Sequence, residues 1–339
     1  IEKIWYPKHL SLEQCSSEIT ARYKARLLQG DSLTDLTGGF GIDCSFLATG
    51  FKSATYVERQ EELCEIAAHN FPVLNLNHIN IKNEDGVTYL QAMSPVDCLF
   101  LDPARRNEHG GKTVAISDCE PNVAELEELL LQKANRVMIK LSPMLDLSLA
   151  LKELKQTQEV HILSVNNECK ELLILLGQTS PAEISIHCVN LFTKGTQKEQ
   201  HFVFTREQEQ CSECTYTDSL ETYLYEPNAS LLKAGAFRSI AAAYPVRKLH
   251  PNSHLYTSDT FIENFPGRIF RIVNQCSFNK KEVKENLADL KKANVTVRNF
   301  PATVAELRKR IHLAEGGDTY LFASTLNNGQ KVLIRCEKV

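Results

Sequence analysis

The sequence predicts an α/β protein in two parts: a parallel sheet with helices on both faces, followed by a smaller α/β sandwich. Short β-rich runs alternate with helical runs from residue 31 to residue 176, which is the pattern of repeated βα units. The first β-rich run ends in a glycine-rich loop, where open α/β sheets bind ligands. After the polar stretch 194–210 the order of helices and strands changes. We therefore predict a helical segment over 1–30, a first domain over 31–210 and a second domain over 211–339.

The first 30 residues are predicted to be helical. Ile19 and Tyr23 belong to a run of apolar residues at helical spacing, and Gly30 ends that run. Ser11 is a candidate N-cap, with a glutamine three residues later. Three charged side chains could either reach toward the glycine-rich loop or form a solvated helix face: Glu18, Arg22 and Lys24. We favour the solvated face for each of them taken singly.

The first domain is predicted from an alternation of strands and helices. The predicted strands are 32–36, 54–58, 79–82, 97–101, 136–141 and 160–165. The predicted helices between them are 44–49, 60–70, 87–93, 122–133 and 145–155. Residues 171–176 and 184–191 are predicted to form a final antiparallel pair, followed by a short strand at 201–204.

The second domain has a different pattern. Helices are predicted over 230–244, 280–292 and 303–311, and strands over 268–273 and 295–299. The segments 319–324 and 331–335 are predicted to form a hairpin, because the sequence Asn327-Asn328-Gly329 between them favours a tight turn. These elements predict a small sheet with helices on one face.

The bulk composition is that of an ordinary globular protein, with 43% hydrophobic residues and a net charge of −4. No global basic field indicates nucleic acid, so such a partner would need a local patch. The 11 cysteines are scattered through apolar runs, which is typical of reduced thiols in a cytoplasmic protein. No apolar run is long enough for a membrane span, and we expect no membrane partner. The lone pair Cys211 and Cys214 favours a loop coincidence over a metal site.

The loop 35–43 predicts a nucleoside pocket. Its glycines let the backbone approach a ligand, Asp35 ends the first strand, and Glu58 ends the second. A dinucleotide and S-adenosylmethionine both fit such a pocket, and Glu58 would hold ribose hydroxyls in either case. Cys44 replaces the third glycine of a dinucleotide fingerprint, and Asp35 suits the cationic end of S-adenosylmethionine, so we favour the methyl donor. Asp85 could accept a hydrogen bond from an adenine amine or simply close a turn.

A second group of polar residues follows the fourth predicted strand. Asp102 stands at the sheet edge that faces the cofactor, and Pro103 fixes the backbone just beyond it. Arg105 and Arg106 would attract phosphate, and the segment 110–112 adds a lysine.

A third, diffuse group mixes basic and aromatic residues in the way that single-stranded RNA is bound. A solvated loop is the alternative that we favour for this group. Its members are Tyr223, Tyr225, Asn228, Lys233, Arg238 and residues 247–256.

Two of these motifs resemble those of a known family. The sequences Asp35-Leu36-Thr37-Gly38-Gly39-Phe40-Gly41 and Leu101-Asp102-Pro103-Ala104-Arg105 are similar to the donor-binding and target-facing motifs of Rossmann-like S-adenosylmethionine-dependent methyltransferases, and closest to RNA-modifying members. The sequences Tyr225-Glu226-Pro227-Asn228-Ala229-Ser230 and His250-Pro251-Asn252-Ser253 resemble the THUMP-like, ferredoxin-like appendage of a bacterial group of methyltransferases.

The resemblance implies S-adenosylmethionine as cofactor, RNA as partner, and a set of site residues. The donor would be contacted by Asp35, Thr37, Gly38, Gly39, Phe40, Gly41, Glu58, Arg59, Asp85, Gly86 and Asp102. The catalytic residues would be Asp102, Pro103 and Arg105.

The sequence departs from the family at the reacting end. Uridine C5 methyltransferases need a cysteine after the fifth strand, whereas this chain has Ser142 and Pro143 there. N-methylating enzymes have a second proline and an aromatic ring after the Asp-Pro pair, and here Ala104 follows. Our leading hypothesis is a methyltransferase acting on RNA. The alternatives are a catalytically inactive methyltransferase fold that binds S-adenosylmethionine or RNA, and a nicotinamide-dependent oxidoreductase.

Overall fold

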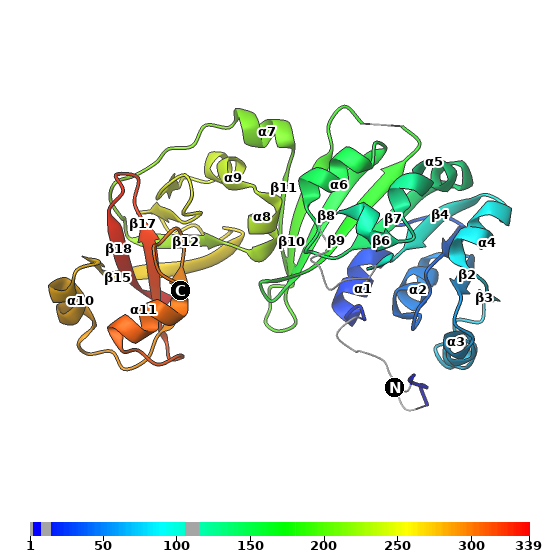
Figure 1. Ribbon diagram of the computed structural model, residues 1–339, viewed down its shortest axis with the longest axis horizontal. Coiled ribbons are helices and arrows are strands. Elements are labelled where there is room, and N and C mark those ends of the chain that lie inside the picture. The colour runs from blue at the N-terminus through cyan, green and yellow to red at the C-terminus, as the bar shows by residue number, and fades with distance from the viewer. Residues whose placement is uncertain (1–2, 8–14, 106–114, 180) are drawn as a thin grey trace. The chain divides into compact units, whose positions relative to one another are not determined.

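The computed structural model describes residues 3–7, 15–105, 115–179 and 181–339. It divides into two compact units, Ile1–Glu199 and Gln200–Val339, which are described separately below. Both units are α/β (Figure 1). The division falls before the predicted boundary at residue 210.

The first unit contains most of a nine-stranded sheet with the order β11-β10-β8-β9-β7-β4-β1-β2-β3. Strands β1, β2, β3, β4 and β7 pair in parallel, and β9 is antiparallel to both of its neighbours. Alternating βα units produce this arrangement, because a helix must cross from the end of one parallel strand to the start of the next. The strands are β1 (Ser32–Asp35), β2 (Ser53–Glu58), β3 (Ile79–Asn83), β4 (Val96–Leu101), β7 (Ala134–Leu141), β8 (Thr157–Val165), β9 (Glu168–Gly177), β10 (Ser185–Leu191) and β11 (Glu199–Phe204).

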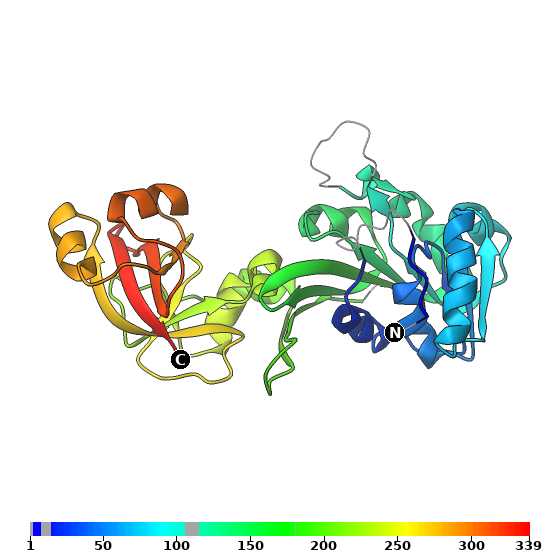
Figure 2. The ribbon, with the colours of Figure 1, turned by 90° about the horizontal axis from the view of Figure 1, so that it is seen from below.

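Helices cover both faces of this sheet. On one face α1 (Glu18–Ala25), α2 (Ile42–Leu47) and α3 (Glu61–Val73) contribute Tyr23, Leu47 and Phe71 to a core with apolar side chains of the strands. On the other face lie α4 (Gly86–Ala92), α5 (Val123–Lys133) and α6 (Leu147–Glu153), as Figures 1 and 2 show. Short elements connect them: η2 (Ala48–Gly50), η3 (Ile116–Asp118) and the two-stranded ribbon of β5 (Ala104–Arg105) and β6 (Cys119–Glu120).

Two details of the predicted elements differ from the structure, and a third is not tested by it. Strands β9 and β10 do not form the expected antiparallel pair, because β9 lies between β7 and β8 while β10 pairs in parallel with β8. The helix predicted over 230–244 is two helices, interrupted at Gly235, which adopts a left-handed conformation with φ of 76°. Helix α1 has Ser17 as its N-cap, and the predicted cap Ser11 lies outside the described residues.

The second unit is a seven-stranded sheet with the order β13-β14-β12-β15-β18-β17-β16. The predicted hairpin forms from β17 and β18, which pair antiparallel along their length. One apolar cluster includes Leu224, Phe270 and Phe322, and a second packs α10 and α11 on the sheet through Leu287 and Leu307. The strands are β12 (Tyr223–Pro227), β13 (Arg247–Lys248), β14 (Tyr256–Ser258), β15 (Gly267–Ser277), β16 (Asn294–Val297), β17 (Thr319–Thr325) and β18 (Lys331–Lys338). The helices are α7 (Arg206–Cys211), α8 (Ala229–Ala234), α9 (Phe237–Ala243), α10 (Lys280–Leu287) and α11 (Val304–Ile311).

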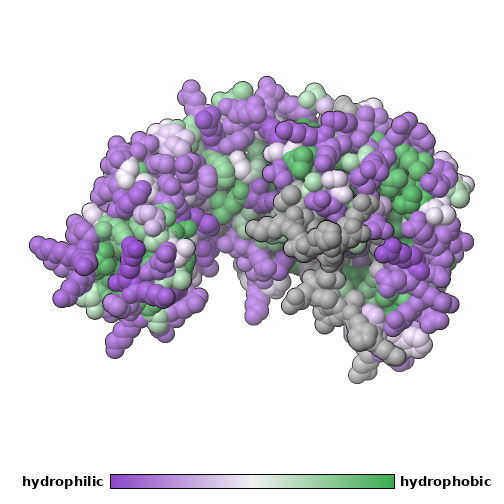
Figure 3. All heavy atoms as spheres, viewed as in Figure 1, coloured by the Kyte–Doolittle hydropathy of each residue, from purple (hydrophilic) through white to green (hydrophobic). Residues whose placement is uncertain are grey.

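The surface seen in Figure 3 is largely hydrophilic on both units, with apolar residues in smaller groups. Among the described residues, none of the helices combines the length and the apolar character that a membrane crossing requires.

Candidate active site

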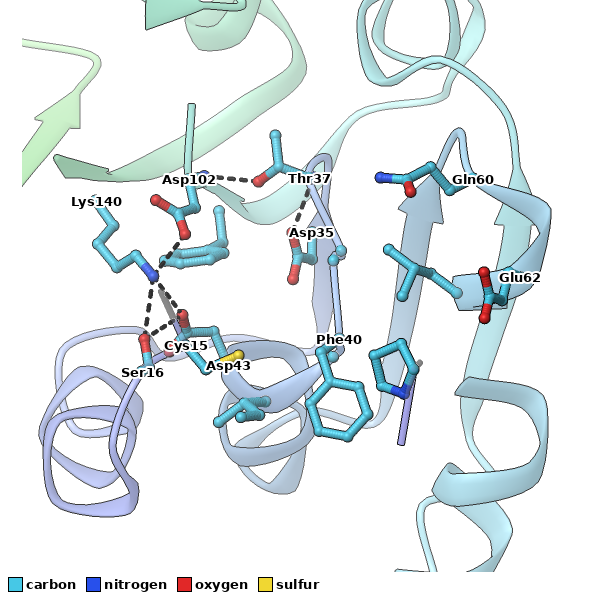
Figure 4. A pocket seen from close by; sticks show the side chains of 17 residues that line it. Cys15, Ser16, Asp35, Thr37, Phe40, Asp43, Gln60, Glu62, Asp102 and Lys140 are labelled. Carbon is cyan, nitrogen blue, oxygen red and sulfur yellow. Dashed lines mark hydrogen bonds and ion pairs between the residues drawn. The ribbon is translucent and has the colours of Figure 1, made fainter. Parts of the chain in front are cut away.

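A cavity of about 350 Å³ opens at the carboxyl ends of β1, β4 and β7 (Figure 4). Its volume is within the range of small-molecule sites. Asp35 is the last residue of β1, Asp102 follows β4, and Lys140 lies near the end of β7. The cavity is lined by Pro7, Cys15, Ser16, Asp35, Thr37, Gly38, Gly39, Phe40, Gly41, Ile42, Asp43, Gln60, Glu62, Leu63, Phe100, Asp102 and Lys140.

The glycine-rich loop needs its glycines for two physical reasons. Gly39 and Gly41 have φ of 53° and 80°, a left-handed conformation that side chains with a Cβ rarely adopt. At Gly38 the reason is space, since a Cβ there would stand 2.2 Å from the ring of Tyr56. The Tyr56 hydroxyl donates a hydrogen bond to the carbonyl of Gly39 and so attaches the loop to β2.

Three backbone N–H groups of this loop are already used inside the protein. Gly38 N donates to the carbonyl of Val57 and Gly41 N to that of Gly38, each at 2.9 Å. Gly39 N donates to Glu58 Oε2, also at 2.9 Å. A pyrophosphate is bound by free N–H donors of such a loop. These three donors are therefore not directed at a ligand phosphate.

Asp35 is a buried carboxyl group on the cavity wall. It is 1% exposed, and its Oδ1 accepts a hydrogen bond from Thr37 N at 3.0 Å. Burial raises the pKa of Asp35 to about 8, and the nearby carboxylates of Asp43 and Asp102 act in the same direction. A carboxyl group with this pKa is largely protonated at neutral pH. A cationic ligand would favour its charged form.

Asp102 is tied to both the loop and β7. Its backbone N–H donates to Thr37 Oγ1 at 2.6 Å, which links the end of β4 to the glycine-rich loop. Its carboxylate Oδ2 lies 2.5 Å from Lys140 Nζ. The side chain of Asp102 is 38% exposed, so the paired carboxylate still faces the cavity.

Beneath Asp102 lies a network of buried charges. Lys140 Nζ is 3.1 Å from Asp43 Oδ2, and Lys24 Nζ is 2.8 Å from Asp43 Oδ1. Lys24 is fully buried and also contacts Glu171 at 2.7 Å. The Ser16 hydroxyl donates to Asp43 and accepts from both lysines. We call Lys24, Asp43, Asp102, Lys140 and Glu171 the charge network; its two cations and three carboxylates give a formal charge of −1.

The network favours the charged forms of Asp43 and Lys140. Burial opposes the charge of Asp43, but Lys24 and Lys140 outweigh it and lower the pKa of Asp43 to about 2. Burial likewise opposes the charge of Lys140, but the attraction of Asp102 and Asp43 is larger and raises its pKa above the ordinary value. Lys140 is thus a cation on the cavity wall, not a free amine.

The structure brings seven of the predicted site residues to the cavity wall and leaves others off it. Glu58 does not line the cavity. Its two carboxylate oxygens accept hydrogen bonds from Gly39 N and Gln60 N. Its contact with a ribose stays a prediction. On that side of the cavity the polar side chains are those of Gln60 and Glu62 (Figure 4). Arg59 lies off the wall and pairs with Glu120 at 3.4 Å.

Asp85 and Gly86 have local structural roles. The Asp85 side chain caps α4 by accepting hydrogen bonds from Val87 N and Thr88 N. At Gly86 a Cβ would stand 2.2 Å from the carbonyl oxygen of Leu36. Neither residue lines the cavity, and their contact with a donor stays a prediction.

The region after Asp102 is described only in part. Pro103 is buried and does not line the cavity. The backbone of Arg105 belongs to β5, which pairs with β6, whereas Arg106 and the predicted basic segment 110–112 lie outside the described residues.

Much of the diffuse basic and aromatic group is part of the core of the second unit. Tyr225 and Lys248 are buried, and Lys248 Nζ donates to the carbonyl of Pro251. Asn228 is buried too and caps α8. His254 stacks on Phe237 with ring centroids 3.6 Å apart. The buried side chains of Tyr225, Asn228 and Lys248 fit neither a solvated loop nor a surface for RNA, whereas His254 is half-buried and Arg238 is exposed.

Sequence reasoning missed the charge network as a unit. Lys140 stands alone in the apolar run Val137–Leu141, and an isolated lysine at the end of a buried strand was the available signal. For Lys24 the favoured solvated face was wrong, since this side chain is fully buried, whereas Arg22 is 66% exposed. Asp43 lay inside the glycine-rich motif, but its partners come from segments distant in sequence.

Comparisons with known proteins agree with this architecture. A ferredoxin-like domain family matches residues 223–266, and a THUMP-like domain family matches residues 267–338. No curated protein matches the chain significantly. The crystal structure of a "putative methyltransferase" from Porphyromonas gingivalis W83 is 37% identical, and the match covers 100% of this chain and 85% of that one with a TM-score of 0.90.

Two other solved structures cover about half of this chain. An rRNA methylase from Streptococcus thermophilus is 14% identical over 47% of this chain and 93% of its own, with a TM-score of 0.34. An O-methyltransferase from Bacillus cereus is 12% identical over 48% of this chain and 83% of its own, with a TM-score of 0.38. The assignment rests on the full-length match: this chain, whose C-terminal region has ferredoxin-like and THUMP-like domains, belongs to the methyltransferase-fold family of the Porphyromonas protein.

Proposed function

We propose that this protein is an S-adenosylmethionine-dependent methyltransferase that acts on RNA. The methyl donor would occupy the cavity beside the glycine-rich loop, and the acceptor would approach Asp102 and Lys140. The observation that carries the proposal is the pairing of a buried carboxyl group, Asp35, with a loop whose glycine N–H donors at 38, 39 and 41 are bonded within the protein.

This pairing distinguishes the two ligands that the sequence left open. A dinucleotide would bring a pyrophosphate close to Asp35 and to a loop whose Gly38, Gly39 and Gly41 N–H donors are already bonded within the protein. S-adenosylmethionine has no phosphate, and its ammonium and sulfonium groups are attracted to a carboxylate. The charge network, with its formal charge of −1, acts in the same direction. Both electrostatic terms support the methyl donor.

The residues at the mouth of the cavity suit alignment of an acceptor. Bound in the cavity, S-adenosylmethionine would supply an electrophilic methyl group on a cationic sulfur. Lys140 holds the Asp102 carboxylate in one orientation, and Thr37 fixes the backbone N–H of Asp102. The carboxylate could then accept a hydrogen bond from the acceptor group and take up its proton. Catalysis would come mainly from holding two reactants in line, which supplies on the order of 7–11 kcal/mol in well-oriented systems.

The distribution of charge supports a nucleic-acid partner. Residues 200–339 contain 19 lysines and arginines against 15 acids, a net charge of +4. Residues 1–199 contain 19 against 27, a net charge of −8. A local positive field on the second unit is what an RNA backbone requires. The exposed helix residues Lys280, Lys281 and Lys309 contribute to it.

Calorimetric titration with S-adenosylmethionine tests the donor site. We expect binding by the unmodified protein and a loss of at least tenfold in affinity for Asp35→Asn. The control is Asp31→Asn, which replaces an exposed acid just before β1 and should leave the affinity unchanged. Transfer of tritium from labelled donor to total RNA tests the reaction. Donor binding without label transfer would indicate the inactive, ligand-binding alternative, and binding of neither donor nor RNA would contradict the proposal.

A further inference from the structure

Away from the donor cavity, three side chains able to bind a metal gather on one face of the first unit's sheet. Glu159 and His161 are two residues apart on β8, so they point to the same face. His187 on β10 is the register partner of His161 in the parallel ladder. The potential ligand atoms of all three lie within 4.8 Å of one another. Two imidazoles and one carboxylate form a donor set suited to first-row divalent cations.

The distances in this group are close to those of a coordination sphere. His161 Nε2 lies 3.2 Å from Glu159 Oε2. Two ligand atoms that are each about 2.1 Å from a zinc ion at a tetrahedral angle are about 3.4 Å apart. The ring of His187 stacks on that of His161 with centroids 4.3 Å apart and an interplanar angle of 14°. A rotation of the His187 side chain would close the remaining distance.

Neighbouring groups orient two of the ligands. The Tyr23 hydroxyl is 2.8 Å from His161 Nδ1, and with the proton on Nδ1 the lone pair of Nε2 points toward Glu159. Arg136 Nη2 donates to Glu159 Oε1 at 3.0 Å and leaves Oε2 on the side of His161. Metal-binding histidines and carboxylates are commonly held by such outer hydrogen bonds, which fix the tautomer and the ring orientation.

Exposure and the neighbouring charge set how an ion could reach this group and how tightly it would bind. The Glu159 side chain is 31% exposed, which gives an ion access and leaves room for water as a further ligand. The Arg136 charge opposes a second cation, and we therefore expect micromolar affinity.

We propose that Glu159, His161 and His187 form a structural site for Zn²⁺. The ion would join β8 to β10 and, through Tyr23, hold α1 against the sheet. Without the ion, the same residues form a hydrogen-bonded and stacked group. The proposal is independent of methyl transfer, because none of the three residues lines the donor cavity.

Zinc binding is tested on full-length, tag-free protein carrying Cys211→Ser and Cys214→Ser, which removes the exposed C-x-x-C pair as a competing site. After treatment with a chelator, the protein is titrated with Zn²⁺ in competition with a chromophoric chelator. We expect one equivalent bound per chain and a rise in the thermal midpoint. Glu159→Gln and His187→Gln should each weaken binding at least tenfold, and His69→Gln, on the exposed side of α3, should not change it.

Two further measurements separate ligation from an effect on folding. Co²⁺ in place of zinc should give visible absorption bands whose intensity falls in Glu159→Gln and His187→Gln, while circular dichroism of the metal-free variants remains unchanged. Tyr23→Phe should weaken binding about 10- to 100-fold, as the loss of an outer hydrogen bond does elsewhere. Less than one-tenth of an equivalent of bound zinc, or equal binding by His187→Gln, would overturn the proposal.

Discussion

Lys140 Nζ lies 2.5 Å from Asp102 Oδ2, and the same ammonium group lies 3.1 Å from Asp43 Oδ2. One buried cation thus connects a cavity-wall carboxylate at the end of β4 with a carboxylate at the start of α2. Because the partners come from separate segments of the chain, the geometry of Asp102 depends on the packing of the whole unit. The predictions below follow from this connection and from the loop beside it.

Replacing Lys140 should impair methyl transfer more than donor binding. Lys140→Met leaves Asp102 without its cation and free to change orientation. A misplacement of about 1 Å in a reacting group costs about 10²-fold in rate. The rate is measured with saturating tritiated donor and RNA. Lys52→Met, which removes an exposed lysine paired with Asp31, serves as the control and should retain full activity. A Lys140→Met protein that transfers methyl groups at the normal rate would exclude Lys140 from positioning Asp102.

Donor affinity should rise with pH. Burial raises the pKa of Asp35 to about 8, and its carboxylate is the form that attracts a cationic ligand. Below that pKa, binding must release a proton, so affinity should rise about tenfold per pH unit as pH increases. Calorimetry between about pH 6 and 7.5 measures the donor affinity over a range in which the donor's α-amino group, with a pKa of about 7.8, is mostly charged. Asp35→Asn should bind weakly with a flat pH profile, and an equally steep profile in that variant would assign the proton elsewhere.

Replacing Lys24 should destabilise the first unit. Lys24→Met would leave the buried carboxylates of Asp43 and Glu171 without their shared cation, and breaking a buried ion pair from one side costs about 3–5 kcal/mol. Urea unfolding followed by circular dichroism measures the change. Arg22→Met, two residues away in the same helix, removes an exposed pair with Glu18 and should change the free energy of unfolding by less than about 1 kcal/mol. Equal stability of the two variants would contradict this ranking.

A methyl group at position 38 should displace the loop. Gly38→Ala places a Cβ 2.2 Å from the Tyr56 ring, so either the ring or the loop must move. Because Tyr56 is buried and its hydroxyl holds the Gly39 carbonyl, we expect the loop to move and donor affinity to fall at least tenfold. The matched control is Gly50→Ala, where the added atom meets open space. Donor titrations of both variants, with thermal midpoints recorded, separate a local change from unfolding.

Local sequence signals predicted the fold class and the hairpin. The βα alternation and the turn at Asn328 and Gly329 act over short distances and need no knowledge of tertiary contacts. The position of β9 between β7 and β8 could not be predicted this way, because a fully apolar run such as Leu172–Leu176 fits any buried strand and does not encode its neighbours. The predicted helix over 230–244 runs through Gly235, whose left-handed conformation ends α8.

The candidate site divides in the same way. Asp35, Gly39 and Asp102 were found because their backbone context identifies the ends of strands. Lys24 and Lys140 meet only through Asp43 and Ser16, and neither the spacing nor the composition of their segments indicates that contact. Long-range pairing of charges is a property of the folded chain, and a single sequence does not show it.

Thr37 is bonded in two directions at once: its N–H to the carboxyl group that ends β1, and its hydroxyl to the N–H of Asp102 beyond β4. A ligand bound beside Asp35 can therefore affect the position of Asp102, because only Thr37 and two hydrogen bonds lie between them. If a ligand draws Asp35 toward itself, Thr37 would transmit the shift to Asp102, which under the proposed function lies beside the methyl acceptor. Under the proposed function we therefore expect ordered binding, in which the small molecule binds before the second reactant.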